Sequence, residues 1–277
     1  AVGGIWRSRR VVAVGDPLQL QPVVTMPRKA QYDIAAAFGV SPVWIPPLAS
    51  VQTLADRVSR YGTTLYHGEK PMWVSAPLTV HRRCDDPMFR LCNQIAYGSM
   101  MVSGVQRRLD DPEHPDLFDG PREQKISPSR WIDVPARTPG THLQDNQIKE
   151  LCKQIEQLQA QGVAMSQIIA ISPFRVVANA LGSLRGRYPG LRGGTIHTAQ
   201  GREADVVFLV LGGDPGAPGA KAWASSTVNL VNVAASRAKR RLYAIGDLAA
   251  WAQYPYFADL ASALTSEPLQ AAGTAAE

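Results

Sequence analysis

Short apolar runs that alternate with amphipathic helical patterns restrict the possible folds of this chain more than any other feature. Such runs fit strands that are buried on both faces, and their alternation with helices is typical of a parallel sheet covered by crossover helices. The predicted strands are residues 11–14, 78–80, 168–171, 206–211 and 242–245, with weaker candidates at 131–134 and 194–197. The sequence therefore predicts an α/β fold.

Two segments carry the helical periodicity that such a sheet requires. Apolar residues recur in helical steps at positions 148, 151, 152, 155 and 158, and again at 174, 177, 178, 181 and 184. A proline-rich stretch, residues 22–77, predicts loops around one short helix near 51–60. A second proline-rich and charged stretch, residues 110–139, predicts a surface insertion.

Composition excludes two classes of protein. With 45% hydrophobic and 19% charged residues, the 277-residue chain can build one or two buried cores, which excludes an intrinsically disordered chain. The longest strongly apolar run, residues 206–211, is too short for a membrane span. The net charge of +6 favours polyanionic partners.

Cysteine usage indicates a reducing compartment. The three cysteines, Cys84, Cys92 and Cys152, have no C-x-x-C spacing, which disfavours both a disulfide framework and a zinc site. A cytoplasmic (intracellular) location fits this usage and the lack of a secretory signal pattern. Because the sequence starts at Ala1 without an initiator Met, we expect a fragment of a longer polypeptide.

The first candidate site follows the predicted strand at 11–14, where the sequence reads GDPLQLQP. Polar groups directly after a parallel strand are well placed, because ligands bind beyond the carboxyl ends of such strands. Gly15 and Pro17 predict a tight turn that projects Asp16 and Gln19. An ordinary strand-to-loop turn is the commoner explanation of such a segment.

Two further segments combine polar groups. In TVHRRC, Arg83 offers a planar fork that suits phosphate oxygens, and a solvated arginine pair is an equal alternative. The segment GTIHTAQGRE holds hydroxyls, glycines, a carboxylate and an arginine, a density more typical of ligand loops than of connectors. His197 alone fits a structural histidine, and no second histidine or cysteine lies at metal-ligand spacing from it.

Arg237 interrupts the apolar stripe of a predicted helix in LVNVAASRAKRR. Leu230, Val233 and Ala234 form this stripe, and Arg237 falls where another apolar residue is expected. An arginine in that position needs an anion or an interface. Residues 239–241 need no function, because a helix C-terminus stabilises cations.

Four segments in order, GDPLQLQP, TVHRRC, IHTAQGREADVV and LVNVAASRAKRRLYAIGD, resemble motifs III to VI of superfamily-one helicases. The likeness is greatest to the branch of the nonsense-decay RNA helicase and its bacterial AAA-type relatives. The resemblance implies the RecA-like P-loop NTPase fold, with residues 1–75 as the C-terminal remnant of a first RecA-like domain. Residues 76–250 would be a nearly complete second RecA-like domain, and residues 251–277 a C-terminal tail.

Members of this family hydrolyse ATP between two RecA-like domains and move along single-stranded DNA or RNA. The resemblance implies catalytic roles for Gln19, which would position the attacking water, and for Arg83 and Arg237, which would meet the γ-phosphate. It also implies nucleotide contacts by Asp16, Gly201 and Glu203, and nucleic-acid contacts by Thr198, His197 and Ser172.

Two parts of such a motor are missing from the sequence. It contains neither the G-x-x-x-x-G-K-[ST] loop that binds ATP phosphates nor the acidic motif that holds Mg²⁺. We therefore expect the N-terminal remainder of the same polypeptide to supply both parts. This chain alone is expected to lack ATPase activity.

Three functions remain open at this point. The first is the C-terminal portion of an ATP-dependent helicase or translocase. The second is a nucleic-acid-binding module that kept the fold and lost ATP hydrolysis. The third, a small-molecule α/β enzyme, is disfavoured because no set of nucleophile, base and orienting group stands at useful positions.

Overall fold

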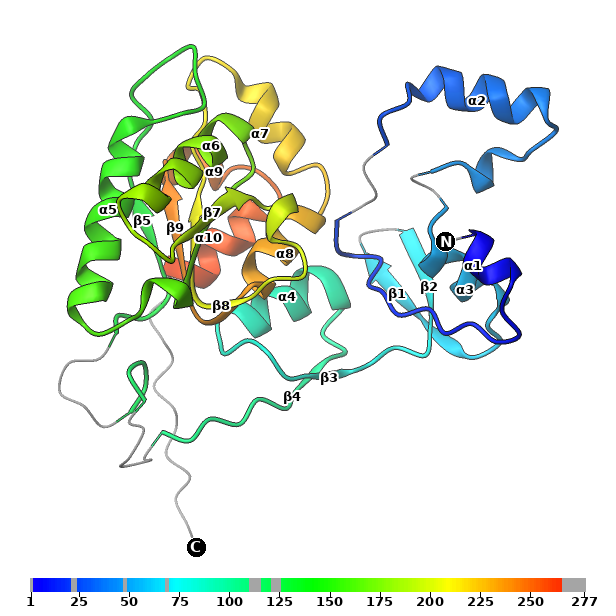
Figure 1. Cartoon of the computed structure of the whole chain (residues 1–277), viewed down its shortest axis with the longest axis horizontal. Helices are drawn as coiled ribbons and strands as arrows, with labels where there is room; N and C mark the ends of the chain where they lie inside the picture. Colours follow the sequence, from blue (N-terminus) through cyan, green and yellow to red (C-terminus); the bar gives the residue numbers. More distant parts are fainter. Residues whose placement is uncertain are drawn as a thin grey trace, which may run out of the picture.

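The main body of the protein is a five-stranded parallel sheet with the strand order β5-β9-β8-β6-β7 (Figure 1). The structure is a computed structural model that describes residues 2–20, 24–46, 49–67, 70–109, 116–120 and 126–265. The strands of the sheet are β5 (Arg130–Asp133), β6 (Ile168–Ser172), β7 (Arg192–Thr195), β8 (Ala204–Val210) and β9 (Ala238–Gly246). The predicted α/β fold with a parallel sheet is confirmed.

The central strands are buried on both faces, as their continuous apolar runs predict. Every residue of β6 is buried, and β8 and β9 are buried along most of their length. Phe208 and Tyr243 are partners on neighbouring strands, and their ring centroids lie 5.3 Å apart. Burial of this kind requires helices on both sides of the sheet.

Helices cover both faces of the sheet. α5 (Asp145–Ala160) contacts β8 and β9, and α6 (Arg175–Ser183) contacts β6 and β7, through the two predicted helical stripes. α8 (Asn229–Ser236) also contacts β8 and β9, and it packs on α4 (Met88–Tyr97). Crossover connections are right-handed and the chain reverses its direction across the sheet after β7, so α8 lies on the face opposite α5 and α6.

The structure corrects the predicted C-terminal tail, residues 251–277. α9 (Leu248–Trp251) and α10 (Phe257–Thr265) follow β9, and α10 packs on α4 and β5. Phe257 and Leu260 are buried because the apolar stripe of α10 covers this side of the sheet. The Ala-rich residues 266–277 lie outside the described residues.

The two strands predicted at 11–14 and 78–80 do not join the sheet. Residues 11–14 belong to no strand, and Val12 and Val14 are each 87% exposed. None of the described strands pairs with them, so their apolar side chains stay in solvent. The second segment forms only the short strand β3 (Val80–His81), which pairs with β4 (Val102–Ser103) outside the main sheet.

The proline-rich stretch at 22–77 contains more regular structure than predicted. After α1 (Val2–Trp6), the N-terminal part holds α2 (Arg28–Ala37), η1 (Pro42–Trp44), α3 (Val51–Val58) and an antiparallel hairpin of β1 (Gly62–His67) and β2 (Lys70–Ser75). Asp56 fixes α3 to the hairpin, because its Oδ1 accepts hydrogen bonds from the Ser75 backbone N–H and hydroxyl at 3.0 and 2.7 Å. This part lies beside the sheet body, where β1 contacts α4 (Figure 1).

The predicted surface insertion at 110–139 is also corrected. This stretch supplies β5, and its residues Phe118 and Ile126 are buried. Residues 110–115 and 121–125 lie outside the described residues. The remaining short elements are η2 (Met165–Gln167), η3 (Leu184–Gly186), η4 (His197–Ala199) and α7 (Pro218–Ala224).

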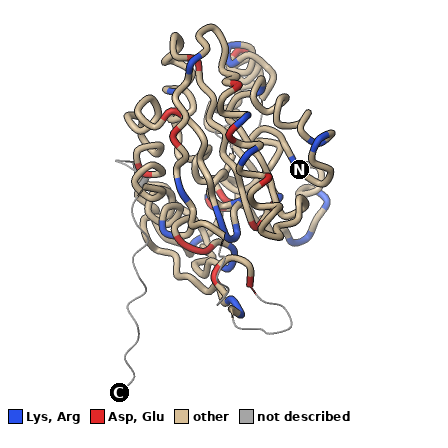
Figure 2. Tube along the Cα trace, turned by 90° about the vertical axis from the view of Figure 1, so that its left-hand side faces the viewer, with Lys and Arg blue, Asp and Glu red and all other residues tan. Residues whose placement is uncertain are grey.

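Charged residues are spread over the whole molecule. Basic and acidic positions are interspersed along the trace (Figure 2), so the net charge does not by itself mark a binding surface. Of the helices in the described part of the chain, none has the length and apolar character that crossing a membrane requires.

Candidate functional site

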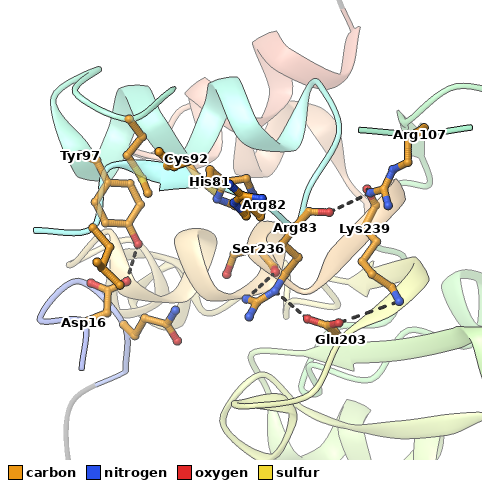
Figure 3. Close-up of a pocket in the computed structure, with 14 residues that line it drawn as sticks. Asp16, His81, Arg82, Arg83, Cys92, Tyr97, Arg107, Glu203, Ser236 and Lys239 are labelled. Carbon is orange, nitrogen blue, oxygen red and sulfur yellow. Dashed lines mark hydrogen bonds and ion pairs between the residues drawn. The ribbon is translucent and has the colours of Figure 1, made fainter. Parts of the chain in front are cut away.

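The turn that carries Asp16 and Gln19 meets the sheet body at a pocket of about 430 Å³, here called the first pocket (Figure 3). Arg83 and Glu203 line it from the sheet body. Glu203 directly precedes β8 and Lys239 lies at the start of β9, so the pocket lies at the amino ends of these strands. The fold thus brings together predicted site residues from three separate segments.

Arg237 is buried next to Gln19. Only 2% of the residue is exposed, and its guanidinium donates to the carbonyl oxygens of Val233 and Arg202 at 3.2 and 3.1 Å. It also donates to Ser236 Oγ at 3.2 Å and to Gln19 Oε1 at 3.4 Å. All of these acceptors are neutral.

The charge of Arg237 is not neutralised by a nearby ion pair. None of the ion pairs among the described residues includes it. Burial, and then the charge of Arg83, lower the pKa of Arg237 from its ordinary value. Because a buried cation without a counter-charge is costly, this position favours an anionic ligand.

Arg83 and Glu203 contact each other directly. Arg83 Nε lies 2.7 Å from Glu203 Oε2, and Arg83 Nη1 donates to the Ser236 carbonyl oxygen at 3.3 Å (Figure 3). Lys239 Nζ lies 3.9 Å from the other Glu203 carboxylate oxygen. Both members of the Arg83 pair are partly exposed, so the pair contributes less than about 1 kcal/mol and an anion can displace it.

The predicted tight turn at residues 15–20 is confirmed. Asp16 Oδ1 accepts the Leu18 N–H at 2.9 Å, and the Gln19 N–H donates to the Asp16 carbonyl oxygen at 3.2 Å. Asp16 Oδ2 accepts the hydroxyl hydrogen of Tyr97. Both carboxylate oxygens of Asp16 therefore have partners inside the protein.

A second pocket of about 1150 Å³ lies at the carboxyl ends of β6 and β7. Thr198 and His197 line it from η4, and both are exposed. The exposed side chains of Arg175, Arg202 and Trp223 also line it. The pocket therefore combines two cations, hydroxyl groups and an aromatic ring.

Three of the predicted site residues, Arg237, Ser172 and Gly201, line neither pocket. Arg237 is buried beside Gln19, which does line the first pocket. Ser172 is fully buried, and its Oγ accepts the Phe174 N–H at 3.2 Å, where the chain turns into α6. This position removes Ser172 from any nucleic-acid surface. Gly201 has φ +80 and serves the turn that leads to Glu203, a conformation that favours glycine.

The first pocket also involves residues that the sequence analysis does not predict as site residues. Tyr97, Arg107 and Lys239 line it, and Asn229 and Asn232 lie behind it on α8. Asn229 and Asn232 are three residues apart in a helix that is otherwise almost wholly apolar. Residues three apart lie on the same face of a helix, so this spacing indicates a polar contact on that face.

The prediction that residues 239–241 lie at a helix C-terminus is wrong. α8 ends at Ser236, and β9 begins at Ala238, which pairs with Ala204 of β8. The basic residues therefore lie in a largely buried strand, where the helix-terminus explanation does not apply.

Arg240 and Arg241 form an ion-pair network with three carboxylates. Arg240 lies 2.7 Å from Asp85, 2.5 Å from Asp116 and 2.9 Å from Asp119. Arg241 Nη2 lies 2.6 Å from Asp119 Oδ1. The network fixes residues 116–120 to the start of β9.

No acidic metal centre is present in the described part of the chain, where no group of three or more His, Cys, Asp or Glu side chains suits a metal ion. A sequence model described as an AAA domain matches residues 63–249. The chain belongs to the AAA domain family. AAA domains of this kind are found in superfamily-one helicases, so the family is a helicase-like family of nucleic-acid-acting ATPases.

The AAA domain match includes Arg83, Glu203 and Arg237, whereas Asp16 and Gln19 precede it. AAA-type NTPases generally use ATP and Mg²⁺. A comparison with curated proteins gives no match.

Proposed function

We propose that this AAA domain is the C-terminal portion of an ATP-dependent helicase or translocase of superfamily one that acts on single-stranded DNA or RNA. The observation that carries the proposal is the buried Arg237 guanidinium, which meets only neutral acceptors, among them Gln19 Oε1. In this assignment residues 1–75 belong to a first RecA-like domain and residues 76–250 form the second.

The first pocket suits the terminal phosphate of ATP. Phosphoryl transfer depends on positioning and charge neutralisation more than on covalent chemistry. Arg83 lines the pocket as a cation, and Gln19, which also lines it, orients the attacking water. Arg237 does not line the pocket, but it is buried against the Gln19 side chain and supplies a second cation beside it. Displacement of Arg83 from Glu203 frees a carboxylate for a ribose hydroxyl.

Magnesium, when bound, adds positive charge at the phosphates. The residues that line the first pocket fit phosphate oxygens better than a metal ion, because their cations, Arg82, Arg83, Arg107 and Lys239, outnumber the two carboxylates. No group of three or more potential metal ligands that could together hold an ion lies among the described residues. We assign the magnesium ligands and the phosphate-binding loop to the N-terminal remainder of the polypeptide.

The second pocket suits a nucleic-acid strand. Single strands are bound through cations that follow the phosphates and aromatic rings on which bases stack. Arg175 and Arg202 provide the cations, Thr198 and His197 provide polar contacts to the backbone, and Trp223 provides the ring.

ATP hydrolysis by the natural full-length polypeptide tests this function. We expect magnesium-dependent hydrolysis that single-stranded nucleic acid accelerates. The 277-residue chain alone is the matched control and should not hydrolyse ATP. Salt-sensitive binding of single strands without hydrolysis by the full-length protein would support the non-hydrolysing binding module instead.

The salt dependence of binding tests the second pocket. Each phosphate contact to a single strand contributes about 0.7 to the slope of log K against log salt concentration. The double change Arg175→Ala and Arg202→Ala should therefore reduce this slope by about 1.4. The measurement is a fluorescence-anisotropy titration at several salt concentrations. The double change Lys29→Ala and Arg90→Ala alters net charge equally outside this pocket, and an equal loss there would refute the assignment.

A further inference from the structure

Side chains from α4 and α8 hold the turn at residues 16–19 against the sheet body. Tyr97, the last residue of α4, donates its hydroxyl hydrogen to Asp16 Oδ2 (Figure 3). Asn232 of α8 donates to the Leu18 carbonyl oxygen at 2.9 Å and to the Tyr97 hydroxyl oxygen at 3.1 Å. The turn is thus held through a carboxylate and through its backbone.

The contact between Asn232 and Leu18 is shielded from water, whereas Asp16 and Tyr97 are partly buried and line the first pocket. Asn232 is 0% exposed and Leu18 is 3% exposed. Burial, and then the charge of Asp16, raise the pKa of the Tyr97 hydroxyl, so this group remains a hydrogen-bond donor at all physiological pH values. Buried polar groups are costly when a partner is lost, so small displacements of the turn are opposed.

The same helix holds the turn and presents Arg237. Asn229 and Asn232 reach the turn from α8, and Arg237 caps the C-terminal end of that helix. Because Arg237 Nη2 lies 3.4 Å from Gln19 Oε1, the relative position of these two groups depends on how the turn is held. A turn that shifts on α8 would separate Gln19 from Arg237.

We propose that Tyr97 and Asn232 are positioning residues for ATP hydrolysis, which hold the turn so that the Gln19 side chain stays against Arg237. This inference rests on the proposed function. Both residues act through the turn, Tyr97 on the Asp16 carboxylate and Asn232 on the Leu18 carbonyl group.

Tyr97→Phe in the natural full-length polypeptide tests this role, because it removes the hydroxyl and keeps the ring. We expect kcat for ATP hydrolysis to fall about ten- to a hundredfold, as for other small misplacements of catalytic groups, while KM for ATP is unchanged. Tyr61→Phe is the matched control, because Tyr61 is 84% exposed, and it should leave kcat unchanged. Amide hydrogen exchange at Leu18 and Gln19 should be faster in Tyr97→Phe only.

A double-mutant cycle of Tyr97→Phe with Asp16→Ala distinguishes a positioning role of Tyr97 from a general loss of stability. After Asp16→Ala, Tyr97 has lost its carboxylate partner, so a further Tyr97→Phe change should lower kcat by less than about twofold. A kcat for Tyr97→Phe equal to that of the wild type would overturn the inference, as would additive effects of the two changes. If the wild-type protein hydrolyses no ATP, the proposed function fails, and unchanged amide exchange would then show separately that Tyr97 does not hold the turn.

Discussion

Arg237→Ala in the natural full-length polypeptide is expected to lower kcat for ATP hydrolysis by about 10³-fold or more, with little change in nucleotide affinity. A cation that meets the terminal phosphate neutralises charge that develops in the transition state, so its loss affects turnover more than binding. Arg237 is suited to this role because its buried guanidinium already contacts Gln19 and has only neutral acceptors. Steady-state kinetics together with nucleotide titration provide the measurement.

Two further variants make the Arg237 result interpretable. Arg237→Lys keeps the charge and loses the planar fork, so we expect it to remain strongly impaired. Arg185→Ala removes an exposed arginine outside both pockets and should leave turnover unchanged. Thermal unfolding of each variant separates lost activity from lost folding. Normal turnover by a folded Arg237→Ala protein would exclude the catalytic role.

Arg240→Met is expected to lower the free energy of unfolding by about 3–5 kcal/mol, the range for breaking a buried ion pair from one side. The Arg240 side chain is 8% exposed and binds Asp85, Asp116 and Asp119, so its removal leaves three neighbouring carboxylates without this cation. It also removes the contact with the Phe118 ring, whose centroid lies 4.9 Å from the guanidinium carbon. Urea unfolding at neutral pH measures the loss.

Arg187→Met is the matched control, because Arg187 forms an exposed ion pair with Glu156. Its expected cost is below about 1 kcal/mol. Equal losses in the two variants would contradict a special role for the buried network.

The effect of Arg240→Met should depend on pH. Burial opposes ionisation of Asp116, but hydrogen bonds from Arg240 and from the Asp119 and Phe118 backbone outweigh it and lower the Asp116 pKa to about 2. A carboxyl whose folded pKa lies below its unfolded value of 3.8 stabilises the protein above that value and loses this effect as pH falls towards 2. Burial raises the pKa of Asp85, which acts in the opposite direction. Because the Asp116 contribution depends on Arg240, the stability difference between wild type and variant should shrink between pH 4 and pH 2.

Local sequence patterns were sufficient to predict those helices and strands whose own residues show a clear apolar run or apolar periodicity. β6 and most of β8 are continuous apolar runs, β9 contains the apolar run 242–245, and α5 and α6 repeat apolar residues at helical spacing. Residues 11–14 carry the same kind of run and form no strand, because a strand also needs a neighbour and none of the described strands pairs with them. The helix at 257–265 was missed because the Ala-rich composition near the end of the sequence resembles a loose tail.

The residues of the candidate site likewise differ in whether the sequence could predict them. Arg237 could be singled out because an arginine in an apolar helical stripe departs from the pattern of its own helix. Nothing near Tyr97 in the sequence indicates its contact with Asp16. Ser172 directly follows the apolar run at 168–171, and its burial shows that β6 includes it. Basic residues 239–241 were placed in a helix because the sequence does not show where pairing with β8 begins.

The sequence by itself therefore determined the parallel α/β fold, most strands of the sheet and the unusual position of Arg237. Only the tertiary structure decided that Arg237 meets Gln19, 218 residues earlier in the chain, that Arg83 pairs with Glu203, and that Tyr97 and Asn232 hold the turn. Periodicity depends on neighbouring residues and can be read locally. Contacts between distant residues depend on strand order and helix packing, which are set by the free energy of the whole fold.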